Sequence, residues 1–237
     1  MSEALIPPIY GEVLELRRHF RLLYGTQALN YLLATPAPTA AQLTAWLDTP
    51  ANLDAYQRLL ATSAGAAAVC ASSATMAAVA GSTKALETLR DSAYGNAALA
   101  NSKIAIDAIL GAGVAAVSTV LSNRTVRQAV YDSDTAFNTL VASVAGKSAI
   151  NSLAVEQQSN STAHVYPPGS AAGIRVVLVS QKSVNVSGYS YAGASADTYV
   201  VTGTTAVVER YVRVTGLTHR TGSGTHGSLI RYLVMQP

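Results

Sequence analysis

The chain is poor in cysteine, in charge and in aromatic residues. Cys70 is the one cysteine among 237 residues, which excludes a disulfide scaffold because such a scaffold needs cysteines in pairs. Charged residues make up 12% of the chain, against about 25% in average soluble domains. Aromatic residues make up 6%. Small apolar side chains each bury little surface area, so we expect a hydrophobic core that is thinner than usual.

The low charge also limits the partners that the chain can have. Its 16 basic residues never cluster beyond Arg17-Arg18, whereas a nucleic-acid interface needs a basic patch. We therefore expect no nucleic-acid partner. Whole-chain disorder is excluded, because the net charge is only +3 and the mean hydropathy is +0.25.

One stretch requires comparison with a membrane span. Residues 108–123 carry no charge, but a spanning helix needs about 20 apolar residues, and this stretch includes glycine, serine and threonine. We expect a buried packing segment and no membrane insertion. The first residues, with Glu3 and Pro7-Pro8, lack the basic and apolar regions of a secretory leader.

A ten-residue repeat runs through the middle of the chain. Serine or threonine recurs at nearly every tenth position, and the series resumes at Ser133 and Ser143 after a one-residue insertion. The third residue after each of these positions is small, and the fourth and seventh are mostly apolar. The first seven positions of the series are Thr62, Ser72, Ser82, Ser92, Ser102, Ala112 and Ser122.

This period predicts one short helix per repeat. Ten residues at about 100° each leave an apolar stripe about 80° out of phase, so one straight helix would not keep it on one face. Serine and threonine are favoured N-caps, and apolar residues three, four and seven places later form one face. Helices this short must stack on neighbours. A pair of long alanine-rich helices, with serines placed by chance, is the alternative.

The first 61 residues predict an N-terminal helical anchor. Residues 11–33 have a heptad seam of Val13, Leu16, Phe20 and Leu23. Thr39 is expected to cap a second helix that ends at Leu47. Thr49-Pro50 places a favoured cap before a proline at the first helical position of a third helix.

The last third of the chain changes character. Residues 156–173 are polar and then rich in proline and glycine, which predicts a linker between the repeat region, 62–155, and a C-terminal β domain, 174–237. The fold class expected is a segregated α+β chain whose β domain is an antiparallel sandwich or barrel-like unit. Its five expected strands cover residues 174–180, 184–191, 197–202, 206–215 and 229–235.

The β domain offers little for catalysis. Asp197 and Glu209 are its two acidic residues, and we expect neither to be catalytic, so the protein is not expected to be an enzyme or to hold a cofactor. His219 and His226 flank a loop; we expect exposed loop histidines and no metal site, although a pair facing across a hairpin is a ligand arrangement. Cys70 is expected to be buried and inert.

Tyrosines are the best binding candidates of the β domain. Tyr189, Tyr191 and Tyr199 offer flat apolar area together with a hydroxyl group, which suits both glycans and protein surfaces. Packing inside the sandwich is the alternative for each of them. The full set of residues expected to contact a receptor or partner is Tyr189, Tyr191, Tyr199, His219, Arg220 and His226.

The repeat carries a resemblance to a known family. Residues 72–80 read SSATMAAVA, which resembles the Ser/Thr-Ala-Met-x-Ala-Val repeats of tailed-bacteriophage tail and tail-fibre proteins. The C-terminal stretches GIRVVLVSQ, VTGTTAVVERYVRVTGL and SLIRYLVMQP are similar to the β domains that close such proteins. The array is irregular around Ala112 and after Ser143, and the first 60 residues have no match of this kind.

The resemblance implies a virion structural protein of the phage tail fibre or baseplate, made in the host cytoplasm. It implies a homotrimer that associates with other tail proteins, and it transfers no catalytic residue. The N-terminal helices would attach it, and the β domain would contact a host-surface glycan or protein. The alternatives are an internal baseplate adaptor without receptor contact and, in a different class, a glycan-active enzyme that uses the β domain.

Overall fold

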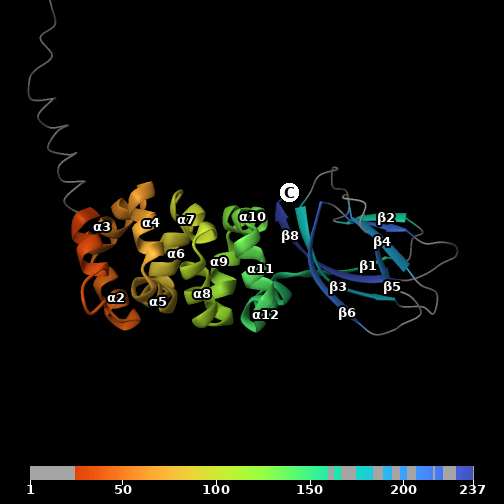
Figure 1. Cartoon of the computed structure of the whole chain (residues 1–237), viewed down its shortest axis with the longest axis horizontal. Helices are drawn as coiled ribbons and strands as arrows, with labels where there is room; N and C mark the ends of the chain where they lie inside the picture. Colours follow the sequence, from red (N-terminus) through yellow and green to blue (C-terminus); the bar gives the residue numbers. More distant parts are fainter. Residues whose placement is uncertain are drawn as a thin grey trace, which may run out of the picture. The chain divides into compact units, whose positions relative to one another are not determined.

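The fold is a run of short helices followed by strands, the segregated α+β arrangement that the sequence predicts (Figure 1). The computed structural model describes residues 25–159, 163–166, 175–183, 189–193, 198–201, 207–215, 217–220 and 228–236. The chain divides into two compact units, Met1–Ala112 and Gly113–Pro237, called unit 1 and unit 2 below. This division falls inside the predicted repeat region.

Short helices, and not a pair of long ones, make up the described part of unit 1. Residues 25–32 are helical, and most of the helices that follow are 7 to 9 residues long. Unit 1 contains α2 (Ala40–Leu47), α3 (Pro50–Leu60), α4 (Ser63–Ala71), α5 (Ser73–Gly81), α6 (Thr83–Asp91), α7 (Gly95–Asn101) and α8 (Lys103–Gly111).

Hydroxyl caps begin most of these helices where the sequence predicts them. The hydroxyl oxygen of Thr62 accepts a hydrogen bond from the Gly65 N–H at 3.1 Å, and Ser72 and Ser82 cap α5 and α6 in the same way. Thr39 forms a full capping box with Gln42. The repeated serine therefore ends one helix and starts the next by satisfying an N–H group that the first turn leaves exposed.

The helices of unit 1 stack with a period of three. α2 packs against α5, α5 against α8, and α4 against α7, in addition to contacts between successive helices. Figure 1 shows α2, α5 and α8 following one another along one edge. The chain turns sharply between α4 and α5, which meet at 94°, and the contacts between helices three apart show that it returns to the same edge. Short helices that are unstable alone are completed by their neighbours in this way.

The apolar positions of the repeat line the interior, as predicted. The fourth and seventh residues after the caps are among the most buried of the chain: Met76, Leu86, Val69, Val79, Leu89 and Leu99 are each at most 2% exposed. These small and medium-sized side chains are buried in successive helices and together form the hydrophobic core of unit 1.

Serine hydroxyls at the junctions α6–α7 and α7–α8 also form hydrogen bonds to the earlier helices α3 and α4. Ser92 Oγ donates to the Leu60 carbonyl oxygen, and Ser102 Oγ donates to the Cys70 carbonyl oxygen, both at 2.6 Å. Each hydroxyl also accepts from an N–H of the helix that follows it, at Gly95 and Ala105 respectively. One hydroxyl can do both because it has one donor hydrogen and two acceptor lone pairs. The cap residue is therefore a link between layers as well.

Three glycines mark junctions that leave no room for a side chain. A Cβ atom added to Gly65 or Gly95 would lie 2.1 Å from the carbonyl oxygen of Leu59 or Leu89, six residues earlier. At Gly146 the corresponding distance to the Leu140 oxygen is 2.0 Å. Glycine is required at these places by the close approach of backbone to backbone.

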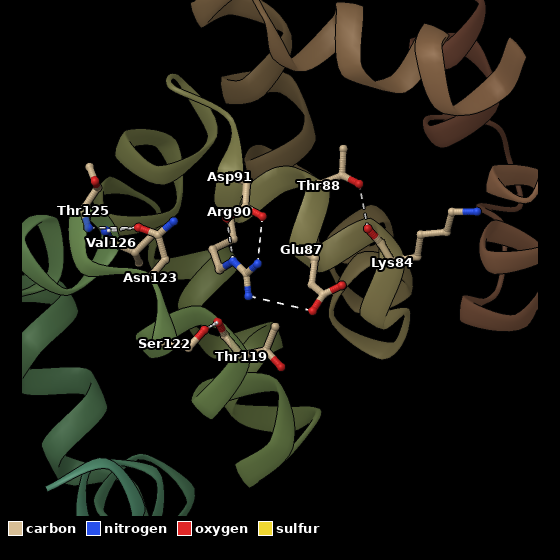
Figure 2. A network of polar contacts seen from close by, with 10 residues as sticks. All are labelled: Lys84, Glu87, Thr88, Arg90, Asp91, Thr119, Ser122, Asn123, Thr125 and Val126. Atoms are coloured by element: carbon tan, nitrogen blue, oxygen red, sulfur yellow. Dashed lines mark hydrogen bonds and ion pairs between the residues drawn. The ribbon is translucent and has the colours of Figure 1, made fainter. Parts of the chain in front are cut away.

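The repeat shifts by one residue at the start of unit 2. Gly113, with φ of +98°, is the N-cap of α9, and the extra residue lies there rather than between Ser122 and Ser133 as the sequence analysis expected. Ala112 and Ser122 are therefore not N-caps. Ser92 is not the N-cap of α7 either, because Tyr94 holds that position, although the Ser92 hydroxyl oxygen accepts from the Gly95 N–H. Asn123 begins the next helix, accepting from the N–H groups of Thr125 and Val126 (Figure 2).

The new register then holds through unit 2, with caps at Gly113, Asn123, Ser133 and Ser143. A positive φ is accessible to glycine at little cost, which explains why the shift occurs at this residue. The helices of unit 2 are α9 (Val114–Ser122), α10 (Arg124–Asp132), α11 (Asp134–Ala142) and α12 (Val144–Leu153). α9 packs against α12, again three helices apart.

Two antiparallel sheets follow the helices. Their strand orders are β1-β8-β3-β6 and β2-β7-β4-β5, and neither closes on itself within the described residues. In β3, the consecutive residues Val177, Leu178 and Val179 are all buried. The strands are β1 (Val155–Ser159), β2 (Ala163–Tyr166), β3 (Arg175–Ser183), β4 (Tyr189–Gly193), β5 (Thr198–Val201), β6 (Val208–Thr215), β7 (Leu217–Arg220) and β8 (Ser228–Gln236).

Three of the strands were not expected from the sequence. β2 and all of β1 except Val155 lie in the stretch expected to be a linker, 156–173. β7 lies just after the fourth expected strand, 206–215. β1 pairs along its whole length with β8, and β2 with β7. Such short polar strands carry a weak apolar signal because backbone hydrogen bonds to a partner strand, and not their own side chains, define them.

Candidate functional site

The sheet β2-β7-β4-β5 holds five of the six residues that the sequence proposes for contact with a receptor or partner. Tyr189 and Tyr191 lie in β4, Tyr199 lies in β5, and His219 and Arg220 lie in β7. The sixth, His226, lies outside the described residues. The sheet therefore places together residues that are up to 31 positions apart in the chain.

The strand register aligns four of the sheet's residues in one row. Tyr191 is directly opposite Tyr199 on one side and His219 on the other. His219 is in turn directly opposite His164 of β2. Residues directly opposite in an antiparallel sheet belong to the same face, and neighbouring strands lie about 4.8 Å apart. His164, His219, Tyr191 and Tyr199, called the His-Tyr row below, therefore cross the whole sheet on one face.

The alternation along the strands assigns the other residues of the sheet to two faces. Tyr189 and Tyr166 occupy register positions of the same face as the His-Tyr row, because each is two residues from a member of it, and so do Leu217, Val201 and Gly193. The intervening positions, which belong to the opposite face, are held by small or β-branched residues and one arginine: Ala163, Val165, Ser190, Ala192, Thr198, Val200, Thr218 and Arg220.

The register separates two residues of the set proposed from the sequence. His219 and Arg220 are adjacent in β7, but their positions alternate, so they belong to opposite faces. Sequence reasoning also missed His164 and Tyr166, because their strand lies in the stretch assigned to a linker. The alternation of polar and apolar residues in AHVY was the one local signal for them, and four residues are too few to make it distinctive.

A second cluster of polar contacts joins helices to a sheet inside unit 2. The Arg213 guanidinium, on β6, donates to the Tyr131 carbonyl oxygen at 2.6 Å and pairs with Asp134. It also lies over the rings of Phe137 and Tyr131, with its central carbon 4.9 and 5.8 Å from the ring centroids. An arginine fits such a place because its planar head forms hydrogen bonds in its plane and contacts aromatic rings with its faces.

Tyr211 occupies the same junction. Its hydroxyl oxygen accepts a hydrogen bond from the side-chain amide of Asn151 on α12, and the Lys147 ammonium group lies 5.3 Å from its ring centroid. Arg231 of β8 donates to the Asn151 carbonyl oxygen at 2.7 Å. Burial raises the pKa of the Tyr211 phenol above its ordinary value, with a further rise from the Glu209 charge. These contacts hold α12 against β6 and β8, and we assign no catalytic role to the residues that make them.

Unit 1 has an open groove of about 490 Å³ between α3, α6 and the turn before α7. Leu53 and Leu60 contribute apolar walls, and Tyr94 at its margin is 49% exposed. Glu87 and Asp91 also line the groove. No local sequence pattern indicates this groove, because its walls come from helices about thirty residues apart.

The acidic groups of the groove are engaged by Arg90. Figure 2 shows the guanidinium of Arg90 between Glu87 and Asp91, with two short contacts of 2.8 and 2.7 Å to the Asp91 carboxylate and a longer one of 3.9 Å to Glu87. The hydrogen bond to Asp91 raises the pKa of Arg90. The charges of the groove are thus largely balanced within α6.

Cys70 lies in the interior of unit 1. The residue is 1% exposed, and burial raises the pKa of its thiol to about 12. A thiol that keeps its proton is a poor nucleophile, which agrees with the expectation that Cys70 is buried and inert.

The carboxylates and potential metal ligands of the described residues are scattered. Glu209 is exposed on β6, and Asp197 lies outside the residues that the structure describes. Within the described part of the chain, no group of three or more His, Cys, Asp or Glu residues is placed to hold a metal ion. No single helix in that part is long and apolar enough to cross a bilayer; α4 and α5 pass the test only together, across their 94° bend.

No protein-family model matches this chain, and no curated protein matches it.

Proposed function

We propose that this chain is a structural protein of a tailed-bacteriophage virion, belonging to a tail fibre or baseplate. In this proposal the N-terminal helices attach the protein to the tail, the short-helix repeat acts as a spacer, and the β region binds a host-surface glycan or protein. The observation that carries the binding role is the His-Tyr row, which gathers two tyrosines and two histidines on one face of one sheet.

The spacer role is supported by the way the helices of unit 1 stack. Each helix is completed by its neighbour and by the helix three places away, and the same serine-to-carbonyl link recurs at Ser92 and Ser102. Repeat architectures of this kind extend by adding identical layers. Low charge and short side chains suit such a part because it needs no site of its own.

The binding role is supported by the chemistry of the face. Tyrosine has a flat apolar ring that stacks on the apolar faces of sugars and on side chains, and a hydroxyl that forms hydrogen bonds. Tyr189 and Tyr166 extend the same face beyond the His-Tyr row. The opposite face, with valine and alanine at several positions, is better suited to packing, because it has fewer polar groups that need partners when buried.

Two finer features of the proposal concern assembly. We include a homotrimer, and a β domain in which the two open sheets form a sandwich or barrel-like unit. The mass of the purified chain in solution tests the first feature: three times 24.5 kDa supports it, and a stable monomer contradicts the trimeric-fibre model.

The binding role is tested with the purified chain and a paired set of variants. Labelled protein is incubated with a panel of bacterial cells and with immobilised bacterial surface glycans. Binding is expected for the parent chain and is expected to fall at least about tenfold in Tyr191→Ala and in Tyr199→Ala. Ser190→Ala and Thr198→Ala, at adjacent positions of the same strands on the opposite face, are the matched controls and are expected to bind as the parent does.

The same experiment separates the alternatives. A chain that binds another tail protein and no cell or glycan is an internal baseplate adaptor. Degradation of a glycan that disappears when Asp197 or Glu209 is substituted would identify a glycan-active enzyme and would contradict the structural role.

A further inference from the structure

We propose that the open groove of unit 1, between α3, α6 and the turn before α7, is a binding site for a neutral saccharide. The site goes beyond the proposed function, in which the helical layers act as a spacer and the β region binds. The groove has a volume of about 490 Å³, which lies within the ~300–1,000 Å³ that is usual for small-ligand sites.

The turn beside the groove departs from the repeat. One residue separates α4 from α5 and α5 from α6, whereas the three residues 92–94 separate α6 from α7. Tyr94 is the N-cap of α7, but its side chain forms no capping hydrogen bond, and tyrosine is not among the favoured caps. The longer turn therefore places an aromatic residue beside the groove without stabilising the start of the helix.

Tyr94 offers a free aromatic group to a ligand. It lines the groove and is 49% exposed, and its hydroxyl and ring have no bonding partner in the part of the chain that the structure describes. A tyrosine presents an apolar ring face together with a hydroxyl group. A sugar ring has an apolar C–H face with hydroxyl groups around its edge, so one tyrosine can contact both parts of it.

Gln57 and Glu87 supply polar groups from the two helical walls. Gln57 is an exposed residue of α3, and its side-chain amide forms no hydrogen bond among the described residues. Glu87 is an exposed residue of α6, and Arg90 contacts its carboxylate at the long distance of 3.9 Å. An amide both donates and accepts hydrogen bonds, and a carboxylate accepts them. These groups match sugar hydroxyls, each of which can donate and accept.

The other charges of the groove are already paired, which favours a neutral ligand. Lys84 contacts Asp48 at 3.0 Å, and Arg90 holds Asp91 at 2.7 Å (Figure 2). An anionic ligand would therefore lie near the Glu87 carboxylate and would have to compete with Asp48 for Lys84. A cationic ligand would be repelled by Arg90. An uncharged saccharide avoids both costs.

The first measurement is saturation-transfer difference NMR of the full chain with maltotriose, lactose and triacetylchitotriose, each titrated separately. We expect at least one of these neutral saccharides to bind with a Kd of about 1 mM. The absence of a signal from all three, which is also the result expected of a groove that takes a protein segment instead, would overturn the proposal.

Substitutions then locate the bound saccharide. Tyr94→Ala and Gln57→Ala are each expected to weaken binding by at least about fivefold. Ile104→Ala, at a residue that is 42% exposed and outside the groove, is the control and is expected to bind as the parent does. Tyr191→Ala, in the sheet, is also expected to leave this binding unchanged. Unchanged binding in both groove variants, or a loss that occurs in Tyr191→Ala instead, contradicts the proposal.

A further pair of variants blocks the groove without removing a polar group. Ala61 lines the groove, whereas Ala67 is an exposed residue of α4 outside it. Ala61→Trp is expected to weaken saccharide binding by at least about fivefold because the indole occupies the site, and Ala67→Trp is expected to leave it unchanged. Thermal unfolding of both variants checks that each is folded. Binding by a folded Ala61→Trp at the parent's affinity would show that the saccharide lies elsewhere.

Discussion

Units 1 and 2 both contain stacked short helices, but they hold their layers together with different side chains. In unit 1 the links between layers are short: Ser92 and Ser102, at the junctions between helices, each donate to the carbonyl oxygen of an earlier helix at 2.6 Å. In unit 2 long side chains connect the helices to a sheet. Two of them, Arg213 and Arg231, donate hydrogen bonds to carbonyl oxygens of helix residues.

The difference follows from what is being joined. Equal helices that stack at a constant step bring the same cap and the same carbonyl group together in each layer, so a serine hydroxyl is long enough. A helix and a strand have different spacings, and their backbone groups do not meet in register. A long side chain with several donors is needed to satisfy the carbonyl groups at such an end. Serine hydroxyls are therefore sufficient where similar helices stack on one another, and arginine side chains connect helices to strands.

The largest expected effect concerns the tight junctions of the helical layers. Gly95→Ala would place a methyl group 2.1 Å from the Leu89 oxygen, and we expect it to lower the free energy of unfolding by about 3 kcal/mol. The measurement is urea denaturation followed by circular dichroism.

Gly111→Ala is the matched control for this prediction. Gly111 ends α8, and an added Cβ would meet no atom within 4 Å. Since alanine is the better helix former by about 1 kcal/mol, this variant is expected to be as stable as the parent or slightly more so. Equal losses in both variants would show that the close approach at Gly95 does not matter.

The next effect concerns the arginine contacts of unit 2. Arg213→Met removes a charged hydrogen bond to the Tyr131 carbonyl and the contact over the Phe137 ring. We expect a loss of about 2 kcal/mol, with faster amide exchange in α10 and α11, measured by mass spectrometry. Arg124→Met, at an exposed position of α10, is the control and is expected to change stability by less than about 0.5 kcal/mol.

A smaller effect distinguishes two serines that the sequence pattern treats alike. Ser102→Ala removes both the cap of α8 and the link to the Cys70 carbonyl, with an expected loss of about 1.5 kcal/mol. Ser122→Ala alters the last residue of α9, where the hydroxyl donates within its own helix to Thr119. Its expected change is below about 0.5 kcal/mol, and thermal unfolding of the two variants side by side tests the difference.

The smallest effect on stability at neutral pH belongs to the Cys70 thiol. Its pKa is raised to about 12 by burial, whereas an unfolded cysteine titrates near 8.5. The contribution of this group to stability is therefore fully present below about pH 8.5 and is lost as the pH rises toward 12. At pH 8 the folded chain is expected to leave a disulfide reagent such as DTNB unreacted, while the chain in guanidinium chloride reacts with one equivalent. Rapid reaction of the folded chain would contradict the burial of Cys70.

Local patterns predicted the helices well because each signal is contained in a few neighbouring residues. Thr39, Thr49-Pro50 and most of the hydroxyl caps begin helices as expected. The shift at Gly113 was missed because Ser122 continues the ten-residue spacing, although Asn123 is an equally good cap. Which of two adjacent caps is used depends on where the preceding helix ends, and the positive φ of Gly113 decides that.

The strands and the candidate site were predicted less fully. Tyr189, Tyr191, Tyr199 and His219 were identified as single residues, but their alignment depends on pairings between strands that the sequence does not specify. His164 was not selected, because β2 has four residues and no apolar run. The groove lined by α3 and α6 also depends on a contact between helices three apart.

The amino-acid sequence by itself determined that this protein is built from short helices capped by small hydroxyl residues, with a narrow core and a separate β region. These properties follow from cap preference, periodicity and composition, which act over about ten residues. The tertiary structure alone decided the three-helix stacking period, the one-residue shift at Gly113 and the His-Tyr row. They arise from contacts between distant segments, and the free energy of such contacts depends on how whole elements fit together.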